Sequence, residues 1–371
     1  MTDWRETLAD PDFLDAVNAP VREGVGWRVE MVNQSGGWVV DMPADQVAVS
    51  MQGDAAERFS ATFTLSDRDW VPTGPRSWLA PTSGLRARIW WQLGDWEVLL
   101  CTLHLARPRI KDDGTSVTIT VTGRDPVSVI RRGGYQSQLL SVGGRTVTAA
   151  LDRMLNLAAP TIPHRIGESG VTLPGVMELG EEDFWGDLWE IAALAGFEPR
   201  TERDGTVTVD EPSAPERISA SFQEGPHCVM LPGLSRDIDT DTFNRVTVVA
   251  SSVEVETPIS ATVECEDRTS PFWVGRYGPF TKRVDSDKVS SVTAARNLAA
   301  AEYRRGLHPT EEVTVVCPQR PDLDYRDRCQ VGREQAGVGG EYRVLGWSMT
   351  LRDRTQPPEP MSIDFMVRED L

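Results

Sequence analysis

The sequence contains few of the residues that metal and redox sites use most. Its 371 residues include only five cysteines, with no C-x-x-C pair, and four histidines. None of the histidines has a partner at metal-ligand spacing (His104, His164, His227 and His308). We therefore expect the cysteines to be small buried hydrophobic residues, and we expect no metal and no other cofactor.

Long apolar runs are also missing. No segment approaches the roughly 18 consecutive apolar residues that a membrane-spanning helix needs. The first six residues, from Met1 to Glu6, lack the basic and apolar regions of a signal peptide. These features predict a chain that is made and folded in a cytoplasm, with no membrane span.

Basic residues are fewer than acidic residues. The chain has 38 lysines and arginines against 56 aspartates and glutamates, which gives a formal charge of −18. Such a balance argues against binding nucleic acid or an anionic membrane by simple electrostatics. Only three of the basic residues are lysines (Lys111, Lys282 and Lys288), a bias that is typical of a GC-rich genome.

Motifs for common catalytic chemistry are absent as well. The sequence has no phosphate-binding G-x-x-x-x-G-K-[ST] loop, no H-E-x-x-H and no G-x-S-x-G. An acidic segment at 237–241 begins like a calcium loop, but Thr242 and Val248 stand where glycine and glutamate are required. We interpret it as a solvated acidic turn, and we expect no enzyme activity.

Period-two alternation dominates both ends of the chain. After a short amphipathic N-terminal arm (1–26), alternating apolar residues mark strands near 59–65, 85–93 and 117–121, with turn signals between them. Residues 27–126 are therefore expected to form an antiparallel β-barrel or sandwich. Strand alternation returns over 216–371, interrupted by one helix at 287–306 that Ser290 or Ser291 would cap.

The middle of the chain has a different character. Thr146 can cap a helix whose apolar residues follow the i, i+3, i+4 spacing up to Pro160, and a second helix begins near Asp183 and ends at Gly196. A hairpin follows at 202–207. Residues 127–215 are therefore predicted to be a small α+β domain between two β-rich regions.

Twelve tryptophans are a high number, and seven of them lie in the first β region. Trp90 and Trp91 are adjacent in a predicted strand, so their side chains should point to opposite faces. We favour packing or subunit contact for this pair, because aromatic residues are enriched at protein interfaces. A sugar-stacking platform is the alternative.

The order of several short segments resembles the tail hub, or baseplate hub, family of bacteriophages, and within it the minor tail proteins of siphophages of high-GC Gram-positive hosts. The resemblance covers most of the chain. Each segment alone is a weak pattern, and their shared order carries the resemblance: 117–126 with Val129 and Ile130, the block from Thr146 to Val209, 243–248, 294–299, 321–327 and 340–344.

This resemblance implies a mainly β fold with an α+β part. Two tail-tube-like antiparallel β-barrel domains (27–126 and 216–371) and a peripheral α+β domain (127–215) would assemble as a trimeric ring with pseudo-sixfold symmetry. The implied function is that of a structural virion protein at the tail tip, which adapts the sixfold tail tube to threefold tip components and forms part of the DNA ejection channel.

The resemblance also implies the partners. They are two further copies in a homotrimer, the tail tube or distal tail protein above, tip, fibre or spike proteins below, and the tape measure protein in the lumen. Genomic DNA would pass through without specific binding, and an acidic lumen would repel it. The alternatives are a host-envelope-acting or carbohydrate-binding tail-tip module, and a distal tail protein.

Six residues are selected as interface candidates. Trp90 and Trp91 are chosen for packing or subunit contact. Asp125 lies at a strand-to-helix junction, Asn244 lies beside the strand that resumes the second β region, and Asp324 and Asp327 lie in the turn before Cys329. For each of them the alternative is an ordinary turn or core residue.

Overall fold

The structure is a computed structural model of the chain. It describes residues 4–19, 24–133, 140–175, 177–179, 183–212, 217–225, 229–237, 243–250, 259–270, 272–306, 312–352 and 358–366. The acidic segment at 238–241 lies outside the described residues, as do His227, Cys228 and His308. The other four cysteines are buried, as predicted.

The N-terminal arm packs on the chain itself. It forms α1 (Trp4–Ala9) and α2 (Pro11–Asn18), and the Asp10 side chain caps α2 by accepting from the Asp12 N–H. Phe13 is completely buried, and its ring meets Trp91 edge-on at 6.5 Å. The apolar face of α2 thus closes one end of the main hydrophobic core.

The first β region follows the predicted alternation. Its strands are β1 (Val25–Val32), β2 (Trp38–Asp41), β3 (Gln46–Gln52), β4 (Phe59–Leu65), β5 (Arg86–Leu93), β6 (Trp96–Asp112) and β7 (Val117–Arg124), with the short 3₁₀ helix η1 (Arg68–Trp70) between β4 and β5. Neighbouring pairs such as β3–β4, β5–β6 and β6–β7 are antiparallel, as the turn signals predict.

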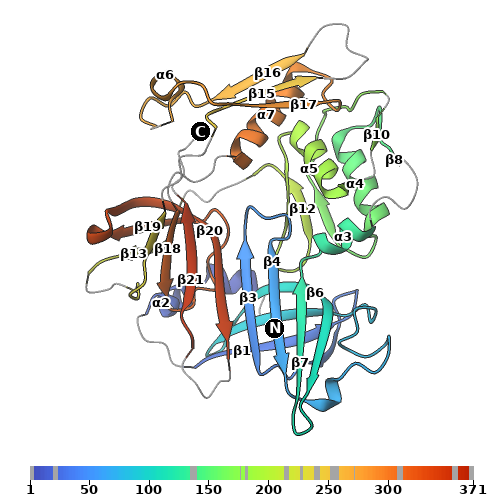
Figure 1. The fold of residues 1–371 in the computed structure, drawn as a ribbon, viewed down its shortest axis with the longest axis vertical. Helices are drawn as coiled ribbons and strands as arrows, with labels where there is room; N and C mark the ends of the chain where they lie inside the picture. Colours follow the sequence, from blue (N-terminus) through green and yellow to red (C-terminus); the bar gives the residue numbers. More distant parts are fainter. Residues whose placement is uncertain are drawn as a thin grey trace.

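The middle region contains the predicted helices and hairpin. Its elements are α3 (Val127–Gly133), β8 (Leu140–Ser141), α4 (Val147–Ala158), β9 (His164–Ile166), β10 (Glu178–Leu179), α5 (Phe184–Leu194), β11 (Glu198–Thr201) and β12 (Val207–Asp210). Thr146 caps α4 by accepting from the Ala149 N–H at 3.3 Å. The α4 and α5 helices pack against each other beside the three-stranded sheet β11-β12-β9 (Figure 1).

The last region supplies two sheets rather than one. Its elements are β13 (Ile218–Gln223), β14 (Ser235–Asp237), β15 (Arg245–Ala250), β16 (Ser260–Glu264), α6 (Val274–Tyr277), β17 (Thr281–Ser286), α7 (Val292–Gly306), β18 (Glu312–Cys317), β19 (Arg328–Arg333), η2 (Glu334–Ala336), β20 (Val338–Leu351) and β21 (Met361–Met366). The β16-β15-β17 sheet is separate and is covered by α7, away from the other strands (Figure 1).

A 13-stranded, mainly antiparallel sheet joins the first and last regions. Its main path runs β14-β18-β21-β20-β3-β4-β7-β6-β5-β1-β2, and the connection is the antiparallel pair β20–β3. The expectation of two closed barrels is wrong for the part of the chain that the structure describes, because this path is open. The edge of β3 that could close the first region on itself is instead occupied by β20.

The described residues pack into two hydrophobic cores. One core lies on the 13-stranded sheet and joins residues from both β regions. The other joins α4 and α5 with residues of β15 and α7, such as Val246 and Leu298. The domain boundaries stay a prediction, but β15–β17 and α7 pack with the middle region because α7 places its small residues against α5.

Candidate functional site: a charged junction and a hydroxyl-lined sheet face

The two candidate tryptophans lie on opposite faces of β5. Trp91 is fully buried in the main core, and its indole N–H donates to Gln319 Oε1 at 2.7 Å. Trp90 is 5% exposed, and the Arg28 guanidinium lies 4.9 Å from the centre of its ring. Both indoles thus contact their own chain, and a subunit contact at these positions stays a prediction.

Asp125 ties three elements together at the end of β7. Its carboxylate accepts from the Phe59 N–H at the start of β4, from Thr201 Oγ1 on β11, and from the Val127 N–H at the start of α3. The residue is completely buried, and burial raises the pKa of its carboxyl to about 6 in spite of these hydrogen bonds. Asp125 therefore fixes the helical middle region to the large sheet.

Two buried arginines extend this contact to the loop before β19. Arg58 donates to the Thr201 carbonyl at 3.1 Å and forms an ion pair with Asp324. Arg203, which is 2% exposed, lies in the β11–β12 hairpin and donates to the carbonyls of Pro321 at 2.6 Å and Leu323 at 2.9 Å. We call Arg58, Asp125, Arg203, Asp324 and Asp327 the charged junction.

Two of the three aspartates of the junction, Asp324 and Asp327, have pKa values shifted in opposite directions. Burial alone would raise the pKa of Asp324, but Arg58 and Arg203 outweigh that effect and hold it below its usual value. Burial, and then the neighbouring negative charge of Asp324, raise the pKa of Asp327 to about 7. Asp327 also accepts from the Asp324 N–H at 2.7 Å. The structure thus brings together three of the six candidate residues, Asp125, Asp324 and Asp327.

This junction predicts a stability that falls as the pH rises from about 5 to 8. Asp125 and Asp327 have folded-state pKa values above those of an unfolded chain, so the folded state holds protons that the unfolded state releases. Replacing Asp327 with asparagine removes the charge and keeps an oxygen for the Asp324 N–H. At pH 8 we expect Asp327→Asn to be more stable than the wild type by about 1–2 kcal/mol, with a flatter pH profile of urea midpoints.

Asp113 provides the control for that experiment. It lies in the exposed β6–β7 hairpin, where hydrogen bonds from Ser116 and Thr115 lower its pKa, so it does not titrate between pH 5 and 8. Asp113→Asn should therefore keep the wild-type slope in this range. An Asp327→Asn profile as steep as that of the wild type contradicts the assignment of a protonated carboxyl at Asp327.

Asn244 holds the aromatic loop at 272–280, beside the β16-β15-β17 sheet. Its side-chain amide is buried and donates to the carbonyls of Phe272 at 2.9 Å and Gly278 at 2.8 Å, while its Oδ1 accepts from the Phe280 N–H at 2.8 Å. In this loop the Tyr277 ring packs between Phe272, which it meets edge-on at 5.5 Å, and Phe280, which is tilted against it at 5.2 Å. Asn244 is therefore a scaffold residue, and the exposed rings that it positions are Tyr277 and Phe280.

Replacing Asn244 with alanine is expected to loosen this loop without unfolding the chain. Two carbonyls and one N–H lose their partners, which costs about 2 kcal/mol. Amide hydrogen exchange in residues 265–280 should become at least tenfold faster, while exchange in β3 and β4 stays unchanged. Wild-type exchange in this loop would show that Asn244 does not hold it. Normal particle assembly with the variant would speak against an interface role for this position.

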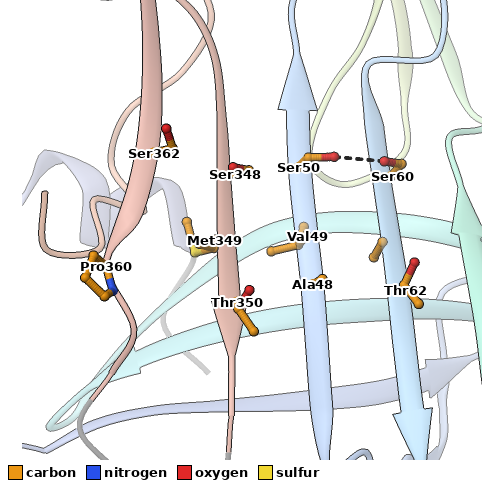
Figure 2. A pocket seen from close by; sticks show the side chains of 11 residues that line it. Ala48, Val49, Ser50, Ser60, Thr62, Ser348, Met349, Thr350, Pro360 and Ser362 are labelled. Carbon is orange, nitrogen blue, oxygen red and sulfur yellow. Dashed lines mark hydrogen bonds between the residues drawn. The ribbon is translucent and has the colours of Figure 1, made fainter. Parts of the chain in front are cut away.

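A second feature of the large sheet is a face lined by hydroxyl groups. Cross-strand pairing aligns Ser362, Ser348, Ser50 and Ser60 in one row across β21, β20, β3 and β4. A second row contains Thr350, Ala48 and Thr62. We call these seven residues the hydroxyl face (Figure 2).

The hydroxyl face is hollowed and carries no charged side chain. It forms a shallow hollow of about 310 Å³, whose lining also includes Val49, Ala61, Met349 and Pro360. Ser50 and Ser60 hydrogen-bond to each other at 2.9 Å across the strands (Figure 2). Because the alternate residues of the same strands, such as Val47 and Phe63, lie in the core, the sheet holds this face rigidly. The face crosses from the first β region into the last one.

Sequence reasoning missed Arg58, Arg203 and the hydroxyl face. Arg203 stands in the polar run 202–205, which has the composition of a solvated turn. The serines and threonines fit the polar positions of ordinary half-buried strands, and only the β20–β3 pairing brings them into one surface. The local sequence around these residues predicts neither the burial of the arginines nor the alignment of the hydroxyl groups.

Two further classes of site are absent from the part of the chain that the structure describes. No group of three His, Cys, Asp or Glu side chains gathers there as metal ligands would. No helix in that part of the chain is long and apolar enough to cross a membrane. Trp38 and Trp78 are exposed, at 62% and 43%, but they lie on separate elements.

Comparison with known proteins shows the same fold in phage tail proteins. The structure is similar to a tail protein from Neisseria meningitidis, with a TM-score of 0.62 and 18% identity, over 92% of this chain and 97% of that one. It is also similar to the 43 kDa tail protein of prophage MuSo2 from Shewanella oneidensis, with a TM-score of 0.63 and 14% identity, over 92% of this chain and 98% of that one.

A third similar structure is an Escherichia coli component of the type VI secretion system, described as structurally similar to the T4 bacteriophage tail proteins gp27 and gp5. The TM-score is 0.52 and the identity 12%, over 88% of this chain and 74% of that one. No family model matches the sequence. No curated protein matches it either. At these identities the likeness establishes a shared fold, mainly β with some helices.

Proposed function

We propose that this chain is a structural protein of a phage-type tail, acting as the hub at the tail tip. The similarity to two tail proteins over nearly their whole lengths supports this proposal, because it covers both β regions and the middle region together. In this role the chain adapts the sixfold tube above it to threefold tip components, as a homotrimer around the axis. The arginine bias supports a high-GC host.

The observation that carries the channel role is the hydroxyl face. It is a continuous hollowed surface without a charged side chain, in a chain with 56 acidic residues. Neutral hydroxyl groups offer DNA phosphates neither ion pairs nor strong repulsion, and their hydrogen bonds exchange readily with water. We propose that this face lines the channel through which the genome passes, in place of the acidic lining expected from net charge alone.

Lysines on the hydroxyl face test this role. Ser50→Lys combined with Ser348→Lys adds two charges per chain at directly paired positions of the sheet, where the like charges should destabilise the fold by no more than about 1 kcal/mol. In assembled particles, each added lysine would pair with passing phosphates, so we expect DNA ejection to slow at least tenfold at low salt and to recover at high salt.

The matched control is Ser260→Lys, at an exposed position on β16 of the separate sheet. It should leave ejection unchanged. Wild-type ejection from particles that carry both lysines on the hydroxyl face would contradict the channel role, while leaving the shared fold untouched.

A further inference from the structure

Four polar side chains form a compact block on the outer face of β5 and β6. Arg86 lies directly opposite His104, and Arg88 lies directly opposite Thr102 in the antiparallel register. Residues two apart in a strand share a face, so the four side chains occupy the corners of one patch. We call these residues the basic block.

The sheet holds the basic block rigidly. The residues between its members, Ala87 on β5 and Leu103 on β6, point the other way and are completely buried in the main core. The tip of the β11–β12 hairpin covers one side, since a Cβ placed on Gly205 would lie 3.3 Å from Thr102 Cβ. Arg86 is 5% exposed and Thr102 is 2% exposed.

Each member of the block keeps a polar atom that is buried without a hydrogen-bond partner among the described residues. These atoms are Arg86 Nε, Arg88 Nε, Thr102 Oγ1 and His104 Nε2. Both arginines also use a terminal nitrogen elsewhere, because Arg86 Nη2 donates to the carbonyls of Gln34 and Asn33, and Arg88 Nη1 donates to the Gly36 carbonyl at 3.3 Å. Two guanidinium N–H groups and a hydroxyl therefore remain for a ligand on this face.

The local charge is positive in spite of the acidic chain. Arg124 lies beside His104 on β7, and the charge of Arg132 on α3 reaches His104. Three acids partly balance this charge. Glu30 lies 2.8 Å from Arg28 and 3.6 Å from Arg88 of the block, Glu57 lies 3.8 Å from Arg124, and Asp204 lies 2.8 Å from Arg5.

The imidazole of His104 is the uncharged member of the basic block, together with the Thr102 hydroxyl. Burial, and then Arg86 and Arg132, lower the pKa of His104 to about 4. The ring is therefore uncharged at pH 7, and in the tautomer with its proton on Nε2 it can donate as well.

We propose that the basic block binds one small oxyanion, held by Arg86 Nε, Arg88 Nε and Thr102 Oγ1. Arginine N–H groups and hydroxyls are the donors that suit carboxylate, phosphate and sulfate oxygens. The low exposure of Arg86 and Thr102 restricts the site to a small ion and keeps a polymer out. The basic block lies in the same cross-strand row as Ser60 of the hydroxyl face, with Arg124 between Ser60 and His104. Anion binding by the purified chain therefore tests the block separately from the channel role, which is tested in assembled particles.

Calorimetric titration of the purified chain tests the site. After dialysis into chloride buffer, the protein is titrated at pH 7 with phosphate, sulfate or acetate at matched ionic strength. We expect saturable binding of at least one of them. Phosphate or sulfate binding identifies a tetrahedral oxyanion, and binding of acetate alone identifies a carboxylate.

Variants assign that binding to the block. Arg88→Gln should raise the dissociation constant at least tenfold. The nearly isosteric Thr102→Val should raise it at least threefold and retain the fold. Arg283→Gln removes an exposed arginine that pairs with Asp285 on β17, and it should bind like the wild type. No saturable binding of any of the three anions overturns the proposal, as does wild-type affinity in Thr102→Val.

Discussion

Replacing Arg203 with alanine is expected to destabilise the chain by about 4 kcal/mol, because the substitution breaks a buried charged contact. Arg203 is 2% exposed, lies 3.4 Å from Asp324, and donates to two carbonyls of the loop before β19. Without it, both carbonyls lose a donor, and Asp324, whose side chain is 34% exposed, is left with Arg58. The midpoint of urea unfolding, followed by tryptophan fluorescence, measures the loss.

Arg283→Ala is the control for that substitution. Arg283 is 64% exposed and pairs only with Asp285 of its own strand at 2.8 Å, so its removal should leave the urea midpoint unchanged. If Arg203→Ala unfolds at the wild-type midpoint, the charged junction does not hold the hairpin to the large sheet, and the middle region is attached by its hydrophobic contacts instead.

Replacing Gly346 with alanine should separate the two β regions. A Cβ at this position would lie 2.6 Å from the Met51 carbonyl oxygen, which belongs to the backbone and has no rotamer that could move it away. Strand β20 must therefore shift away from β3, at a cost of about 2–3 kcal/mol. Hydrogen exchange of the paired amides in 47–52 and 346–351 should accelerate together, because this register joins them.

Gly339 of the same strand provides the matched control. A Cβ on Gly339 meets no atom within 4 Å, so Gly339→Ala should change stability by less than about 0.5 kcal/mol. Equal stability of the two variants would mean that β20 and β3 are not closely paired, and that the hydroxyl face is not one surface.

The local elements could be predicted because their signals are local. Alternation marks β4 and β7 to within a few residues, and the Thr146 cap and Pro160 bound α4. Ser291 similarly caps α7 by accepting from the Ala294 N–H. In each case the residues that decide the structure lie within one or two turns of each other.

The long-range arrangement could not be predicted in the same way. Alternation of apolar residues identifies the buried face of β20, but it does not identify the strand that pairs with β20. Two separate barrels and one joined sheet are therefore equally compatible with the pattern. Small residues along α7 indicate close packing, and they suit the middle region as well as a β-barrel. The contacts that decide between these arrangements connect residues about 100 or more positions apart, such as Asn297 and the Leu194 carbonyl.

The candidate residues also show that local signals could be found in the sequence and long-range contacts could not. Asp125, Asp324 and Asn244 were selected from the order of short segments, and the structure gives each a scaffolding role within the chain. Arg58 and Arg203, the arginine partners of Asp324, resemble the many exposed arginines in local sequence. Only the fold distinguishes the buried arginines from the exposed ones.

Electron cryomicroscopy of the intact tail tests the central claim most directly. We predict three copies of this chain in a ring on the tail axis at its tip, with Ser50 and Ser348 of each copy facing the channel. The hub role is contradicted if the chain lies away from the axis. The channel role of the hydroxyl face is contradicted if another protein covers this face while charged side chains line the channel.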